Sequence, residues 1–322
     1  MDYLAAHVFR HADGMSAYRS PASRAALIAL SVAAVAYVAA LTVLRRDSGF
    51  SPIEPLFLFA LLGVVFPLLA WLCTLRARPA ADVPRRKHGQ LRRVLLYLAA
   101  FAIAVLGWGF SAINTAFPDE PVQSIVQLLV KLATMVVLPA WLFLGLRLAT
   151  RPTLSAQRLL LAFVVLSLAY LAMQAVFGRG LVTLRELAPS ATTLAWAIPL
   201  AWLWQTLEAG LCEEVLFRRI LQEKLALATG SQVAAVAWAS LLFGLAHAPG
   251  LWLRGGHLME GVAYATPSWA IAYSIVMIAP AGIAFGVLWA RTRSLWLIVP
   301  LHGMVDLLPQ LAPFIRAWSG VQ

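Results

Sequence analysis

Long apolar runs constrain the fold of this chain more than any other feature. They lie at about 25–44, 55–75, 94–117, 122–146, 159–177, 191–217, 231–248, 268–290 and 294–311. A helix needs roughly 20 apolar residues to cross the hydrocarbon core of a bilayer, and most of these runs are about that long. The sequence therefore predicts an all-α protein, a polytopic transmembrane bundle of about eight or nine helices.

The composition excludes other classes of protein. The chain is 61% hydrophobic and 12% charged, whereas soluble domains carry about 25% charged residues. The net charge of +11 does not indicate nucleic-acid binding, because the basic residues lie between apolar runs. We therefore expect a lipid bilayer, and no nucleic acid, as a partner. Cys73 and Cys212 lie within apolar runs, which favours neither a disulfide framework nor a cysteine metal site.

The basic residues predict the orientation in the membrane. The segment 76–93 holds Arg76, Arg78, Arg85, Arg86, Lys87, Arg92 and Arg93. Such loops stay in the cytoplasm, which gives a cytoplasmic N-terminus and places residues 118–121 outside.

Residues 1–23 lack the pattern of a cleavable signal peptide. Because the chain is rich in Ala, Leu and Arg, we expect a bacterial inner membrane protein.

Polar residues divide the chain into two parts. Residues 1–155 read as N-terminal transmembrane helices of unassigned role, and Lys131 is the exceptional charge among them. We interpret Lys131 as a snorkelling lysine or one bonded to a neighbouring helix. Residues 156–322 read as a core whose polar motifs lie within 190–311. Ionisable residues in spanning segments are costly and mark functional sites, so we expect the site in this second part.

Two adjacent carboxylates end one apolar run. Glu214 and Arg218 are four residues apart, so on a helix they share a face and can form an ion pair. Glu213 is displaced by about 100° around the helix and faces elsewhere. We therefore interpret Glu214 as the structural partner of Arg218 and Glu213 as a candidate general base.

His247 is expected at the same depth as Glu213. Gly230 is a plausible turn between two antiparallel helices. Glu213 lies seventeen residues before it and His247 seventeen residues after it. At 1.5 Å per residue, both side chains would lie about 25 Å from the turn. The spacing predicts that a helical hairpin brings the carboxylate and the imidazole together.

His302 and Asp306 form a second pair with helical spacing. The carboxylate could orient the imidazole and fix its tautomer, or both groups could surround a reacting carbonyl.

Two mechanisms are compatible with these four residues. In the first, Glu213 with His247 activates a water that attacks a peptide carbonyl, and His302 with Asp306 stabilises the oxyanion. In the second, Glu213, His247 and His302 bind zinc or another divalent metal with an open position for water. We favour the first mechanism, with no cofactor, because no His-Glu-x-x-His signature occurs. The signatures of serine and aspartyl intramembrane proteases are also missing.

The pattern Gly282-Ile283-Ala284-Phe285-Gly286 is typical of helix packing.

These motifs resemble those of the CPBP family, which comprises CAAX prenyl endopeptidases and bacteriocin-processing or Abi-type proteins. The family pattern is Glu-Glu-x-x-x-Arg, then Phe-x-x-x-His, then His-x-x-x-Asn or Asp. The matching residues are Glu213, Glu214 and Arg218, then Phe243 and His247, then His302 and Asp306. The resemblance covers about residues 190–311. Asp306 stands where the eukaryotic branch usually has Asn.

The resemblance implies an intramembrane endopeptidase of glutamic type. It implies catalytic roles for Glu213, His247, His302 and Asp306, with Glu214, Arg218 and Phe243 in support. The substrate would be a membrane-anchored protein or peptide, which need not be prenylated. Two other functions stay open: a non-catalytic membrane immunity or scaffold protein of the same fold, and a transporter with a proton relay. The lack of a repeat between the two halves weighs against a transporter.

Overall fold

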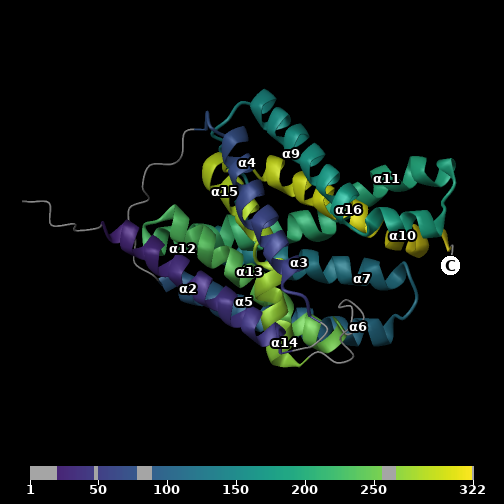
Figure 1. Cartoon of the computed structure of the whole chain (residues 1–322), viewed down its shortest axis with the longest axis horizontal. Coiled ribbons are helices and arrows are strands. Elements are labelled where there is room, and N and C mark those ends of the chain that lie inside the picture. Colours follow the sequence, from purple (N-terminus) through teal and green to yellow (C-terminus); the bar gives the residue numbers. More distant parts are fainter. Residues whose placement is uncertain (1–19, 47–49, 78–88, 256–265, 321–322) are drawn as a thin grey trace, which may run out of the picture.

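The computed structural model describes residues 20–46, 50–77, 89–255 and 266–320. Within these ranges the chain is almost entirely helical, and several helices contain π-helical segments, labelled η (Figure 1). The elements are α2 (Pro21–Leu44), α3 (Ile53–Leu58), η2 (Phe59–Val65), α4 (Phe66–Cys73), α5 (Gly89–Phe101), η3 (Ala102–Gly109), α6 (Phe110–Ala116), α7 (Val122–Lys131), η4 (Leu132–Val137), α8 (Leu138–Leu144), α9 (Ala156–Phe177), α10 (Gly180–Leu187), α11 (Ala191–Gln205), η5 (Thr206–Leu211), η6 (Glu214–Gln222), α12 (Glu223–Thr229), α13 (Gln232–Arg254), α14 (Pro267–Tyr273), η8 (Ser274–Ile278), α15 (Ala281–Thr292) and α16 (Leu295–Ser319).

Seven helices in the described ranges are long and apolar enough to cross a membrane. A bent pair, Pro267–Ile278 with Ala281–Thr292, raises the number to eight, and the two halves meet at 52°. The apolar run at 191–217 is helical but is not among these candidate spans. It continues to Thr229 as one polar-containing helical segment. The predicted all-α polytopic bundle is confirmed, with seven or eight candidate spans.

The hairpin expected around Gly230 is present. Helix α12 ends at Thr229, and Gly230 adopts the left-handed conformation with φ of 67°, which glycine reaches without steric strain. The side-chain oxygen of Ser231 then accepts a hydrogen bond from the backbone N–H of Ala234 at 3.3 Å, as an N-cap residue does. The turn therefore sends α13 back along the helical segment that carries Glu213.

Two helices form the centre of the bundle. Helix α13 packs against α2, α14, α15 and η3, whereas α16 packs against α9, α10, α11 and η5. Helix α4 packs against α15, so helices from the first part of the chain cover the second part. The division of the chain into domains at residue 155 stays a prediction.

Two glycines allow α16 to approach the π-helical segment η5 closely. A Cβ atom on Gly210 would lie 2.3 Å from the carbonyl oxygen of Val299, and one on Gly303 would lie 2.8 Å from the backbone nitrogen of Thr206. Both distances are far shorter than van der Waals contact, so the two backbones can come this close only because both residues are glycines. This contact fixes the position of η5 against the helix that carries His302.

A cluster of arginines lies at one end of the bundle. Figure 1 shows α12 and the start of α2 at one end, and α10 with the connection between α6 and α7 at the other. At the α12 end, an Arg219 guanidinium nitrogen donates to the carbonyl of Arg147 at 3.1 Å, and Glu223 pairs with both Arg219 and Arg293. We call this the basic end. The N-terminal residues 1–19 and most of the basic segment 76–93 lie outside the described residues.

Candidate active site

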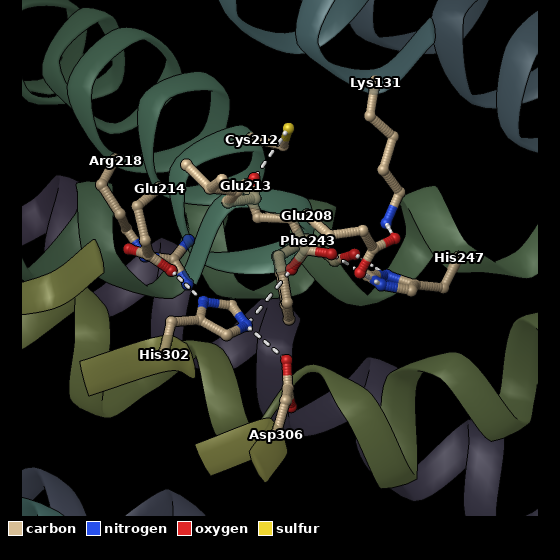
Figure 2. Close-up of polar contacts among 11 residues, drawn as sticks. Lys131, Glu208, Cys212, Glu213, Glu214, Arg218, Phe243, His247, His302 and Asp306 are labelled. Atoms are coloured by element: carbon tan, nitrogen blue, oxygen red, sulfur yellow. Dashed lines mark hydrogen bonds and ion pairs between the residues drawn. The ribbon is translucent and has the colours of Figure 1, made fainter. Parts of the chain in front are cut away.

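Glu213 lies between the two π-helical segments η5 and η6. A π-helix is wound more widely than an α-helix, is rare, and occurs often at functional sites. The wider winding changes the angle between neighbouring side chains around the helix axis. Adjacent side chains on a helix point in different directions, and Glu213 and Glu214 face different neighbours, as Figure 2 shows.

The Glu213 carboxylate lies between two imidazoles. Its Oε1 atom is 3.9 Å from Nε2 of His247, and its Oε2 atom is 3.6 Å from Nε2 of His302. Both distances exceed a direct hydrogen bond and suit a shared water molecule or reacting atom. The proximity of Glu213 and His247 predicted from the hairpin is therefore present, while their chemical role stays a prediction.

His247 is held in one tautomer. Its Nδ1 atom is 2.8 Å from the backbone carbonyl oxygen of Phe243, and because a carbonyl can only accept, Nδ1–H donates. The Nε2 atom facing Glu213 is then free to accept a hydrogen bond. Phe243 also packs edge-on against the His247 ring, with centroids 4.9 Å apart. Phe243 thus positions His247 through its backbone and its ring.

Glu214 contacts His302 as well as Arg218. Its Oε2 atom is 3.4 Å from Nε of Arg218, which confirms the ion pair predicted from their spacing. Its Oε1 atom accepts a hydrogen bond from Nδ1 of His302 at 2.8 Å, a contact that the sequence did not predict. Both side chains of the ion pair are 0% exposed. The supporting acid is therefore a direct partner of the second histidine.

His302 is surrounded by three carboxylates. Besides Glu213 and Glu214, Asp306 places Oδ2 3.5 Å from Nε2 of His302, so the pair shares a face as predicted. Two acids face Nε2 and one binds Nδ1, which favours an imidazole that carries protons on both nitrogens. The ring also packs against Phe285, with centroids 4.9 Å apart. His302 is thus placed to donate hydrogen bonds into the site.

Lys131 and Glu208 add an ion pair that the sequence did not place here. The Nζ atom of Lys131 donates to Oε1 of Glu208, and Figure 2 shows the pair beside Glu213 and His247. Of the two interpretations of Lys131, the bond to a neighbouring helix is the one observed. Glu208 could have been noticed as an acid within the apolar run 191–217, because such residues mark functional sites.

A divalent metal held by Glu213, His247 and His302 stays the alternative to the mechanism without a cofactor. Among the residues that the structure describes, no three His, Cys, Asp or Glu side chains are arranged to hold one metal ion. Zinc requires nitrogen and oxygen ligands at about 2.0–2.2 Å around one point. The set of Glu213, His247 and His302 does not meet this requirement as the side chains lie.

One family model matches the part of the chain that carries most of these residues. Residues 194–308 match the family model described as type II CAAX prenyl endopeptidase Rce1-like. The chain is similar to this family over these residues. The chain matches none of the curated proteins and none of the solved structures with which it was compared. The candidate spans indicate an integral membrane protein, and residues 194–308 are similar to a family of peptidases.

The matched range contains all but one of the site residues. Glu208, Glu213, His247, His302 and Asp306 lie within 194–308. Lys131 lies outside this range, on α7 in the N-terminal part of the chain. One N-terminal helix, α7, therefore supplies a charged side chain beside the candidate site.

Proposed function

We propose that the chain is an intramembrane endopeptidase in which Glu213 and His247 activate water to hydrolyse a peptide bond of a membrane-associated protein. The observation that carries the proposal is the position of the Glu213 carboxylate, 3.9 Å from Nε2 of His247 and 3.6 Å from Nε2 of His302. One carboxylate thus faces an acceptor nitrogen on one side and a donor nitrogen on the other. Hydrolysis of an amide needs both functions around one carbonyl.

In the proposed reaction, one water proton passes to Glu213 while the other is held by Nε2 of His247. The water oxygen bonds to the carbonyl carbon, and the carbonyl oxygen becomes an oxyanion. Protonated His302 donates to this oxyanion, because Glu214 holds its Nδ1–H. Glu213 then transfers its proton to the amide nitrogen as the carbon–nitrogen bond breaks. Asp306 acts through His302 as a positioning residue, since an ionised carboxylate cannot donate to an oxyanion.

The experiment uses the full chain reconstituted in lipid vesicles with a library of membrane-anchored peptides. Glu213→Gln and His247→Ala should each lower the cleavage rate by roughly 10²- to 10⁴-fold, the usual contribution of a general base. Glu186→Gln is the matched control, because this exposed glutamate lies on α10, away from the site. Full cleavage by the Glu213 variant would show that the assignment is wrong.

The same assay separates the two mechanisms. We propose that cleavage needs no metal, so a strong chelator should leave the wild-type rate unchanged. A rate that falls with chelator and returns when zinc is added would instead support the metal-dependent mechanism.

A further inference from the structure

A polar cavity of about 240 Å³ adjoins the candidate active site. Its polar lining comes from three separate elements: Glu120 and Gln127 from the start of α7 and the turn before it, Gln205 and Glu208 from the α11–η5 segment, and Gln310 from α16. Glu208 belongs to both the cavity wall and the ion pair with Lys131. The cavity therefore reaches the edge of the site.

Each of the three elements continues from the cavity towards the site. Gln127 lies four residues before Lys131, and Gln310 lies four residues after Asp306, so each pair shares a helix face. On the third element, Glu208 lies five residues before Glu213. On each of the three elements, one polar side chain therefore lines the cavity and another lies in or beside the candidate active site.

The cavity lies towards the end of the bundle opposite α12. Glu120 belongs to the connection between α6 and α7, which Figure 1 shows at the opposite end from α12. Trp318, near the end of α16, lines the same cavity. Its ring packs edge-on against that of Trp204, with centroids 5.2 Å apart.

The chemistry of the lining suits one class of occupant. Glutamine amides both donate and accept hydrogen bonds, so Gln127, Gln205 and Gln310 can bind the backbone of an extended peptide. Of the two acidic lining residues, Glu208 is paired with Lys131, which leaves Glu120 as the charge available to a ligand, and none of the described lining residues is basic. Complementary charge favours a partner, and like charge excludes one.

We propose that this polar cavity is the subsite for the peptide segment next to the scissile bond, and that it selects basic or uncharged segments over acidic ones. The proposal rests on the proposed endopeptidase function. It names the part of the substrate that lies outside the hydrocarbon core: a short polar segment that enters from the end of the bundle opposite the basic residues.

The first test compares three membrane-anchored peptides that differ at two positions beside the cleaved bond, which carry Lys, Gln or Glu. The wild-type chain should cleave the Lys and Gln peptides with a higher kcat/KM than the Glu peptide. Glu120 is exposed, so each charge pair with it should change kcat/KM by up to about fivefold. Glu120→Lys should therefore reverse the preference between the Lys and Glu peptides.

The matched control is Glu186→Lys. It makes the same charge change on an exposed glutamate of α10 that does not line the cavity. A second variant, Ser124→Trp, fills the cavity. It should raise KM for the full peptide and leave KM unchanged for a peptide truncated before the variable positions.

The results separate this proposal from the one on which it rests. If cleavage depends on Glu213 but all three peptides are cleaved equally, the subsite is wrong and the endopeptidase stands. The subsite is equally wrong if Glu120→Lys behaves like Glu186→Lys. If Glu213→Gln cleaves as well as wild type, the endopeptidase assignment itself fails.

Discussion

Glu213 and Glu214 are neighbours in the chain with different surroundings. Glu213 faces two imidazoles at distances that admit a reacting atom, whereas Glu214 is fully buried between Arg218 and His302. A buried charge is tolerated when it is paired. The two cations around Glu214 therefore explain why a second carboxylate can lie beside the first in an apolar bundle.

The pair of Glu214 and Arg218 makes a prediction about stability and activity. Glu214→Gln leaves the Arg218 guanidinium buried without an opposite charge, which typically costs about 3–5 kcal/mol. The double variant Glu214→Gln with Arg218→Met should recover most of this loss, because a buried ion pair can be replaced by neutral groups with little penalty. Cleavage should stay low in both variants, since Nδ1 of His302 has lost its carboxylate.

Thermal unfolding in detergent micelles measures the stability, and the reconstituted peptide assay measures cleavage. Arg218→Met alone is the control, because it keeps the bond between Glu214 and His302. Wild-type cleavage by the double variant would show that Glu214 serves Arg218 alone.

The residues of the site were only partly predictable from the sequence. The i, i+4 rule identified the pairs of Glu214 with Arg218 and of His302 with Asp306, because both depend on local helix geometry. The bond between Glu214 and His302 joins residues 88 positions apart and depends on how α16 packs against the preceding segments. Lys131 lies in the other half of the chain, and its partner Glu208 has no helical spacing that points to it.

At the scale of elements, the close contact between η5 and α16 positions His302 against Glu213. A Cβ atom on Gly303 would lie 2.3 Å from Oγ1 of Thr206 and 2.8 Å from its backbone nitrogen. Gly303→Ala should therefore push the two elements apart and destabilise the fold by about 1–3 kcal/mol. Cleavage should fall more than tenfold, because a shift of about 1 Å between catalytic groups is enough to lower the rate strongly.

Thr206→Ala in the same chain should restore part of the activity, since it removes Oγ1 but not the backbone contact. Gly63→Ala is the control, because its added methyl group would meet the side chain of Phe59, far from the site in sequence. Full activity of Gly303→Ala would mean that this contact does not set the position of His302.

Helices were easier to predict than their details. The apolar runs indicated the helices correctly, because hydrophobic patterns are visible in a short stretch of sequence. Gly230 indicated the hairpin correctly, because glycine adopts the left-handed conformation that the turn requires. The π-helical segments around Glu213 have no such signal, since the apolar pattern does not distinguish their winding from that of an α-helix. Gly282 and Gly286 were attributed to helix packing, and added Cβ atoms there would contact Ser240 and Val236 of α13.

At the scale of the whole molecule, the arginine cluster and the polar cavity lie at opposite ends of the bundle. Arg147, Arg219 and Arg293 meet at the basic end, and the polar cavity lies towards the other. Positive loops remain in the cytoplasm. The polar segment of a substrate would then reach the site from the outer side of the membrane.

Cysteine labelling in intact cells tests this orientation. Asp119→Cys, in the exposed connection between α6 and α7, should react with a membrane-impermeant maleimide. Arg151→Cys, in the exposed connection between α8 and α9, should react only after the membrane is permeabilised. The wild-type chain supplies the background, because Cys212 is buried and Cys73 is partly buried. The reverse labelling pattern would place the polar cavity on the cytoplasmic side, where the subsite would serve cytoplasmic segments and the orientation predicted from the arginines would be wrong.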